Sequence, residues 1–150
     1  AVLFCAPGIP SVYYGSEFGV AGVKTHDDWN LRPEFSPHAL AKVSAQPHLF
    51  SWIRRLAEIR KSSPALRWGS YVQRLVTGDQ FGFSRHVEGE DVLVLVNNAN
   101  ETAELSVLMP GFEGKGFADL LTPGDSFFVD ARGNLAVRLY PKSARILRRD

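Results

Sequence analysis

The sequence predicts an α+β chain of two unlike parts: a strand, a loop and a helix over residues 1–65, and an all-β antiparallel sandwich over residues 66–150. Three observations support this prediction. An apolar run rich in β-branched and aromatic residues lies near the start, and an amphipathic helical pattern is centred near residue 54. Beyond about residue 66, short runs of β-forming residues alternate with turn residues and no helical period appears.

The composition is that of an ordinary soluble globular protein. The 150 residues are 45% hydrophobic and 22% charged, with a formal net charge of +1. Because the basic residues are spread along the chain, we expect neither nucleic acid nor a membrane as a partner. The single cysteine, Cys5, excludes an internal disulfide and lies in an apolar run, where a small buried residue is expected. No oxidising compartment is implied, and we expect a cytoplasmic location.

Residues 1–6 have an unusual character for the start of a protein. They lack an initiating Met and a cationic leader, and they are too short to span a membrane. Their apolar run is typical of the end of a buried helix. We therefore expect the chain to be the C-terminal piece of a longer protein.

The first expected β-strand covers residues 9–14, between the Pro7-Gly8 turn and a glycine-rich exit that begins at Gly15. It is apolar at nearly every position, as strands are in a parallel sheet that is covered on both faces. In α/β barrels, the functional side chains lie just past the carboxyl ends of such strands.

Residues 15–37 are expected to form a long loop, because they show no sustained period of 2 or 3.6. A loop of this length in a compact protein is usually functional or disordered, and the aromatic Trp29 among mixed charges favours a binding loop.

Two carboxylates held ~5–5.5 Å apart can hydrolyse a glycosidic bond with retention. Surface loops carry carboxylates routinely, however, and spacing alone places no pair here. Four carboxylates lie near the loop: Glu17, Asp27, Asp28 and Glu34.

An amphipathic helix of about four turns is expected next, and it would cover the preceding strand. Pro47 lies at its start and Ser62-Ser63-Pro64 ends it. Its apolar residues recur at i, i+3, i+4, i+7 and i+8: Leu49, Trp52, Ile53, Leu56 and Ala57.

Eight short strands are expected in the second part. Their approximate ranges are 71–76, 81–87, 92–96, 103–109, 116–121, 126–129, 135–139 and 144–147. Alternation of apolar and polar residues over 135–139 predicts one solvated face. Pro141 suits the entry to the last strand or a sheet edge. Because sandwiches avoid parallel crossovers, we expect antiparallel Greek-key pairing.

Residues 8–17 resemble the last barrel strand of the α-amylase family of glycoside hydrolases, which carries Gly-Ile-Pro-x-x-Tyr-Tyr-Gly-x-Glu. Residues 56–66 resemble the closing helix of that family, with the pattern Leu-x-x-Ile-Arg-Lys-x-x-x-Ala-Leu. Gly69, Tyr71 and residues 94–97 look like parts of its C-terminal sandwich. The resemblance implies that residues 1–65 form the last βα unit of a TIM (β/α)8 barrel and residues 66–150 a C-terminal sandwich domain. The glycine-rich exit is most similar to members that act on cyclodextrins or short malto-oligosaccharides.

The resemblance also implies a function: retaining hydrolysis of α-1,4-glucosidic bonds in malto-oligosaccharides, cyclodextrins or starch. A transglycosylase or an α-1,6-acting relative would use the same parts, so the pattern leaves the bond type and the choice between hydrolysis and transglycosylation open. The catalytic carboxylates of the family lie upstream of the matched segment, so we assign no catalytic residue here. The expected partners are an α-glucan oligosaccharide substrate and the upstream barrel portion of the same polypeptide. No cofactor or metal is expected. The histidines lack the spacing of metal ligands: His26, His38 and His86.

Four residues are expected to bind substrate. Asp28 and Arg32 match the Asp-x-x-x-Arg pair that binds sugar hydroxyls in many family members, although the more familiar Asp-Pro is Asp28-Trp29 here. A carboxylate accepts hydrogen bonds from two adjacent hydroxyls and a guanidinium donates in a planar fork; alternatively, the two form a salt bridge that fixes the loop. Trp29 either stacks on a sugar or anchors the loop. Glu17 either lines the site or accepts backbone N–H bonds from the glycine-rich turn.

A rival function is a glycan-binding or purely structural β-sandwich module. Such a binding module needs exposed aromatic side chains for stacking on sugars. Most of the available ones can be absorbed by the core of so small a domain. The candidates are Tyr71, Phe112, Phe117, Phe127, Phe128 and Tyr140.

Overall fold

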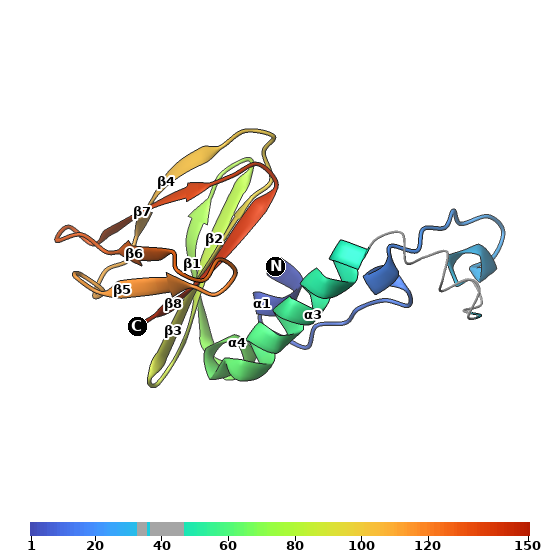
Figure 1. Ribbon diagram of the computed structural model, residues 1–150, viewed down its shortest axis with the longest axis horizontal. Helices are drawn as coiled ribbons and strands as arrows, with labels where there is room; N and C mark the ends of the chain where they lie inside the picture. The colour runs from blue at the N-terminus through green and yellow to red at the C-terminus, as the bar shows by residue number, and fades with distance from the viewer. Residues whose placement is uncertain (33–35, 37–46) are drawn as a thin grey trace. The chain divides into compact units, whose positions relative to one another are not determined.

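The computed structural model describes residues 1–32, 36 and 47–150 (Figure 1). The described residues fall into two compact units. Ala1–Gly8 and Ile59–Asp150 form the first, which we call the sandwich unit, and residues 9–58 lie in the second, the loop unit. Glu34 and His38, which the sequence analysis named, lie outside the described residues.

The sandwich unit is described throughout and contains eight strands. Their bounds are β1 (Ser70–Val76), β2 (Gln80–Val87), β3 (Glu90–Asn97), β4 (Ala103–Leu108), β5 (Gly116–Asp119), β6 (Ser126–Phe128), β7 (Asn134–Leu139) and β8 (Ser143–Arg149). Six of them form one sheet in the order β1-β2-β3-β8-β5-β6, and β4 pairs with β7 in a second sheet. Every pairing is antiparallel, which confirms the β-rich, antiparallel prediction for this part of the chain.

The last four strands follow a Greek-key order. β5 pairs with β6 on one side and with β8 on the other. A single bridge between Val129 and Leu135 joins the end of β6 to the start of β7. The spatial order is therefore β8-β5-β6-β7, in which the fourth strand lies beside the first.

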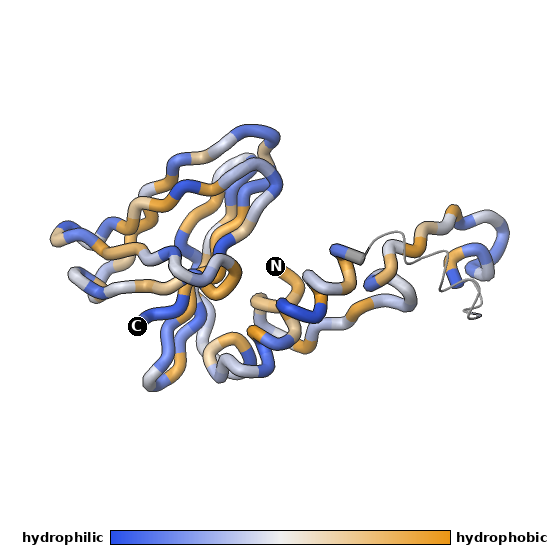
Figure 2. The backbone as a smooth tube through the Cα atoms, viewed as in Figure 1, coloured by the Kyte–Doolittle hydropathy of each residue, from blue (hydrophilic) through white to orange (hydrophobic). Residues whose placement is uncertain are grey.

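The hydrophobic core lies between the two sheets. Strand β7 shows how the pattern builds it: Leu135, Val137 and Leu139 are buried while Ala136 and Arg138 between them are exposed. Figure 2 shows that hydrophobic and hydrophilic stretches both occur along the strands of this unit. One face of β7 thus faces the core and the other faces solvent, whereas β3 is buried on both faces from Asp91 to Leu95. The buried members of the core are Leu93, Leu95, Val107, Met109, Phe117, Val129, Leu135, Val137, Leu139 and Leu147.

Strand β1 forms one edge of the larger sheet. Its pairing with β2 shifts register between Gln73 and Leu75, at a bulge. Between these two residues, Arg74 donates from Nε to Ser84 Oγ at 2.8 Å. At the opposite edge, β6 is only three residues long.

Two helices pack in the sandwich unit and a third links the two units along the chain. Helix α1 covers Val2–Cys5, α4 covers Pro64–Trp68, and α3 runs from Pro47 to Ser62. The amphipathic helix predicted from the sequence is therefore confirmed, with the expected proline at its start. Ser63 caps α4 by accepting a hydrogen bond from the Leu66 N–H.

The structure differs from the sequence prediction at residues 9–14, which form no strand. A strand exists only when its N–H and C=O groups pair with a neighbour, and the described residues of the loop unit include no other strand. The apolar pattern shows that the segment is suited to a sheet. It does not show which other strand would pair with it.

No helix among the described residues combines the length and the apolar character needed to cross a membrane.

A buried ion-pair cluster ties β5, β8 and the turn after β5 together. Arg145 Nη1 lies 2.7 Å from the Asp119 carboxylate, whose side chain is fully buried, and 2.7 Å from that of Asp125. Its guanidinium also lies 4.9 Å from the ring centroid of Phe127. Burial alone would lower the pKa of Arg145, but the hydrogen bonds to Asp125 and Asp119 outweigh it and raise the pKa.

Replacing Arg145 with Met is expected to lower the free energy of unfolding by about 3 kcal/mol and the melting temperature by at least about 10 °C. The change leaves the buried Asp119 carboxylate with only the Leu121 N–H as a donor. The matched control is Arg138→Met, because Arg138 pairs with Glu104 on the surface, where both side chains are mostly exposed. The control should melt close to the wild type. Equal losses in the two variants would contradict the assignment of a buried, stabilising cluster.

The domain boundary near residue 65 that the sequence predicts leads to a second prediction. Residues 66–150 should unfold cooperatively alone, and residues 1–65 alone should show no cooperative transition. A polypeptide of residues 59–150 should be more stable than 66–150, because it keeps the Ser63 hydroxyl and the Ala65 N–H that donate to the Glu90 carboxylate at 3.0 and 2.8 Å. Thermal melts followed by circular dichroism measure whether each polypeptide unfolds cooperatively and at what temperature. A sharp transition of residues 1–65 alone would show that the boundary is misplaced.

Candidate functional site

The glycine-rich exit after residue 14 forms a tight turn in the loop unit. Gly15 and Gly19 flank a short 3-10 helix, Ser16–Phe18, and both have left-handed backbone angles, with φ of 76° and 71°. Only glycine adopts that region without strain. The turn closes when the Val20 N–H donates to the Gly15 carbonyl. It fixes where the Glu17 side chain leaves the backbone.

A second turn carries the other predicted residues. Here a 3-10 helix covers Trp29–Leu31. A Cβ atom on Gly22 would lie 2.2 Å from the Asn30 carbonyl oxygen, so only glycine allows this close approach. The Asp27 carboxylate accepts from the Trp29 N–H at 3.1 Å. Asp27 therefore stabilises the turn and sets the start of the short helix.

The side chains of Asp28, Trp29 and Arg32 line one cavity of about 190 Å³. Asp28 pairs with Lys24 across 3.1 Å, and both side chains are more than half exposed. Arg32 donates from Nε to the Tyr13 hydroxyl at 2.8 Å. This hydrogen bond and the nearby charge of Asp28 raise the pKa of Arg32. Among the described residues, the partners of Asp28 and Arg32 are thus Lys24 and Tyr13 rather than each other.

The exposure of Trp29 bears on its role. Its side chain is 79% exposed, so burial does not explain the presence of a large aromatic residue at this point of the loop. The cavity combines a carboxylate that accepts hydrogen bonds, a guanidinium that donates them and an exposed ring face. These three groups are the ones that bind the hydroxyls and the apolar face of a sugar ring.

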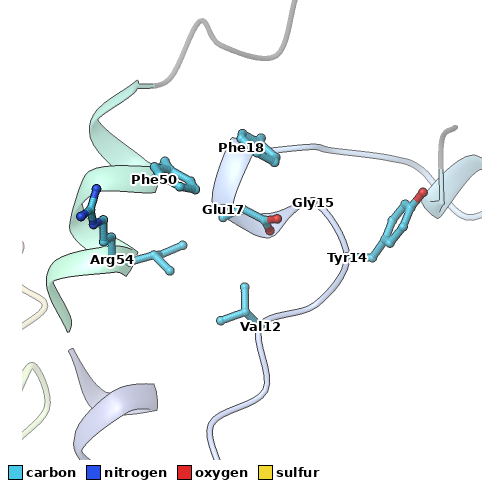
Figure 3. Close-up of a pocket in the computed structure, with 8 residues that line it drawn as sticks. Val12, Tyr14, Gly15, Glu17, Phe18, Phe50 and Arg54 are labelled. Carbon is cyan, nitrogen blue, oxygen red and sulfur yellow. The ribbon is translucent and has the colours of Figure 1, made fainter. Parts of the chain in front are cut away.

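Glu17 lies in a different and larger cavity of about 610 Å³ (Figure 3). Phe18 and Phe50 stack at its rim with ring centroids 5.7 Å apart. The charged residues that line it are Glu17 and Arg54, and Arg54 is paired with Glu58 at 3.0 Å on the same helix. The full lining is Val12, Tyr14, Gly15, Glu17, Phe18, Phe50, Ile53 and Arg54. The structure therefore groups three of the four predicted residues and places Glu17 apart from them.

Two residues next to the site were missed by the sequence analysis. Lys24 could have been found, since it stands four positions before Asp28. Tyr13 could not, because it lies 19 positions away from Arg32 and no local pattern links the two. Among the described residues, no group of three or more His, Cys, Asp or Glu side chains is arranged to hold a metal ion.

Comparison by sequence finds relatives named cyclomaltodextrin glucanotransferase and cyclomaltodextrinase, although no family model matches the chain. A cyclomaltodextrin glucanotransferase of Bacillus licheniformis is 34% identical over 100 residues, which is 67% of this chain and 13% of that protein. A cyclomaltodextrinase of Thermoanaerobacter pseudethanolicus is 29% identical over 146 residues, which is 97% of this chain and 23% of that protein. The chain thus spans between an eighth and a quarter of the length of these curated relatives.

Comparison by structure gives the same result for the fold. The crystal structure of an α-amylase from Geobacillus thermoleovorans, complexed with acarbose, superposes with a TM-score of 0.84. The match covers 99% of this chain and 31% of that one at 24% identity, so it shows likeness of fold alone. By sequence and by fold together, this chain is a relative of the enzymes of the α-amylase family.

Proposed function

We propose that this chain serves an enzyme that hydrolyses α-1,4-glucosidic bonds in malto-oligosaccharides, cyclodextrins or starch with retention. It supplies a substrate-binding loop and a supporting sandwich. The observation that carries the proposal is the shared cavity of Asp28, Trp29 and Arg32, in a chain whose homologues are α-glucan-acting enzymes.

The three residues would share the work of holding a sugar. Asp28 accepts hydrogen bonds from adjacent hydroxyls, Arg32 donates to a hydroxyl or ring oxygen, and Trp29 stacks on the apolar face. Lys24 and Tyr13 orient the charged pair, because each already contacts one member of it. Glu17 would contact substrate only from its separate cavity, so its role is the least direct of the four.

The bond-breaking groups are proposed to come from the upstream barrel portion of the same polypeptide. A retaining mechanism needs a nucleophile and an acid/base about 5–5.5 Å apart. Two of the described carboxylates of the loop have other partners: Asp27 accepts from a backbone N–H, and Asp28 pairs with Lys24. Glu17 lines a separate cavity. No step at the reacting carbon is assigned to this chain, and no metal or cofactor is invoked.

The domain organisation follows from the same proposal. Residues 1–65 would be the C-terminal end of the catalytic barrel, with α3 as its closing helix. Residues 9–14 would pair as a barrel strand once neighbouring strands are present, because their nearly continuous apolar run suits a parallel sheet that is covered on both faces. Residues 66–150 would be the C-terminal sandwich.

The rival glycan-binding sandwich is less well supported. Phe117 is buried in the core, and Phe112 and Phe127 pack against it. Tyr71, Phe128 and Tyr140 remain exposed, at 40%, 68% and 59%. Titration of residues 66–150 with maltotriose distinguishes the two functions, since only a binding module would respond without the loop.

Replacing Asp28 with Ala in the enzyme that carries this chain is expected to lower kcat/KM for long malto-oligosaccharides by roughly 10- to 100-fold. The variant loses charged hydrogen bonds to the sugar, while groups at the reacting carbon are untouched. The deficit should therefore shrink for substrates with no sugar beyond the cleaved ring. Arg32→Ala should behave in the same way, and the double variant should lose less than the sum.

Lys24→Met is the matched control for Asp28→Ala. It removes the salt bridge and leaves the Asp28 carboxylate in place. If Asp28 acts on the sugar, the control should lose less activity than Asp28→Ala, because Lys24 only orients a carboxylate that is still present. If Lys24→Met loses as much as Asp28→Ala, the carboxylate serves only the loop and the proposed role is refuted.

The 150-residue chain by itself is expected to release no product from maltotriose, because the catalytic carboxylates are proposed to lie outside it. Product analysis by chromatography at high protein concentration tests this. Cleavage that disappears in Glu17→Gln or Asp28→Asn would instead place a catalytic carboxylate within the loop.

A further inference from the structure

The side chain of Arg85 is buried although it carries a charge. Arg85 lies on β2 and is 1% exposed. Its guanidinium donates to three backbone carbonyls: Cys5 and Leu66 from Nη1, at 2.8 and 3.0 Å, and Gly69 from Nη2 at 2.8 Å. Burial lowers the pKa of Arg85, and the nearby charge of Arg60 lowers it further. A buried cation of this kind is retained only where its hydrogen bonds offset the cost of desolvation.

All three carbonyls lie at or next to the end of a short helix. Cys5 ends α1, Leu66 lies in the short helix α4, and Gly69 is the residue that follows α4. Carbonyls in the last turn of a helix have no partner within the helix and carry partial negative charge. Arg85 therefore joins two helix ends to the sheet on which it lies.

A second arginine binds the same N-terminal segment. Arg60 donates from Nη1 to the Phe4 and Ala6 carbonyls, at 2.8 and 3.2 Å, and from Nη2 to the Gly8 carbonyl at 2.5 Å. Gly8 is the last residue before the loop unit, and Arg60 lies just after the chain returns from it at Ile59. One side chain thus holds together the exit and the re-entry of the loop unit.

We propose that Arg60 and Arg85 form an anchor that holds the segment of residues 1–8 on the rest of the sandwich unit. The anchor fixes, within that unit, the two points at which the chain leaves for the loop unit and returns from it, which makes the two arginines positioning residues for the loop. Arg60 ties the two ends to each other, and Arg85 ties the segment before the exit to β2 and α4. Holding both ends removes much of the conformational freedom of the intervening chain. The consequence for Asp28 and Arg32 rests on the proposed function; the anchor itself does not.

Cys5 offers a direct measurement, because it is the only cysteine of the chain and is 1% exposed. Labelling by a thiol reagent such as 5,5′-dithiobis(2-nitrobenzoate) requires the segment of residues 1–8 to leave the sandwich. Arg85→Met and Arg60→Met are each expected to raise the labelling rate of the intact 150-residue chain by roughly 10- to 100-fold. Each variant removes the donor of three backbone carbonyls.

The electrostatic effect of these substitutions has the opposite sign. Burial raises the pKa of Cys5 to about 11, and the charges of Arg60 and Arg85 partly counteract this. Removing either arginine would therefore disfavour the reactive thiolate in the closed state and slow direct labelling. A faster rate can come only from detachment of the segment.

Arg148→Met is the matched control, since Arg148 lies on β8 of the same sheet with an exposed side chain. It should label at the wild-type rate. Arg85→Lys should restore part of the protection, because an ammonium donates to fewer of the carbonyls than the planar fork. In the arginine variants the labelling rate should depend only weakly on the urea concentration, because local opening exposes little surface. Circular dichroism should show that the sandwich remains folded under the same conditions.

Two results would overturn the anchor: unchanged labelling in folded Arg60→Met and Arg85→Met, or labelling that follows the urea dependence of global unfolding. If Arg85→Met does not fold, the labelling rate of Cys5 in Arg60→Met alone tests the anchor.

Kinetics in the enzyme that carries the chain test the positioning of the loop. Both arginine variants should raise KM for long malto-oligosaccharides several-fold with little change in kcat. If labelling rises but neither Asp28→Ala nor the arginine variants change the kinetics, the proposed function fails and the anchor stands. If Asp28→Ala lowers kcat/KM but labelling does not respond, the anchor fails and the proposed function stands.

Discussion

The hydrogen bonds from the buried Arg85 guanidinium to three backbone carbonyls connect parts of the chain that no local pattern brings together. They join β2, α4 and the segment of residues 1–8 at one point. A neutral side chain of the same volume would leave all three carbonyls without donors in a region closed to water, at a cost of about 1–3 kcal/mol each. The sandwich unit, as the structure defines it, therefore includes a segment that lies more than fifty positions away in sequence.

Most of the regular structure could be predicted from the sequence, because it depends on local periodicity. Short runs of β-forming residues between turn residues located the strands of the sandwich, and the 3.6 period located α3. The segment of residues 9–14 shows the limit of this approach: its apolar composition suits a strand, but a strand is a property of a pair. The grouping of Asp28 with Arg32 followed from their closeness in sequence. The contact between Tyr13 and Arg32 did not, since only the folded loop brings these residues together.

The loop that carries the candidate site separates its structural residues from its binding residues. Gly15, Gly22 and Asp27 shape the backbone through left-handed angles, a close approach and a side-chain hydrogen bond. Asp28, Trp29 and Arg32 are then held with much of their polar and aromatic surface open to solvent. A loop ordered by its own turns loses less conformational entropy when a ligand binds than a loop that must be ordered at that moment.

The edges of the larger sheet bear on how the protein behaves at high concentration. An edge strand presents unpaired N–H and C=O groups to which a strand of another molecule can add, the first step towards aggregation. In β1 the bulge between Gln73 and Leu75 interrupts that row, and Arg74 places a charge at the interruption. At the other edge, β6 is too short to template a long pairing. Deleting one residue of the bulge would straighten β1. The regular edge would then be open to pairing with a strand of another molecule, so the variant would aggregate more readily even if the fold survived.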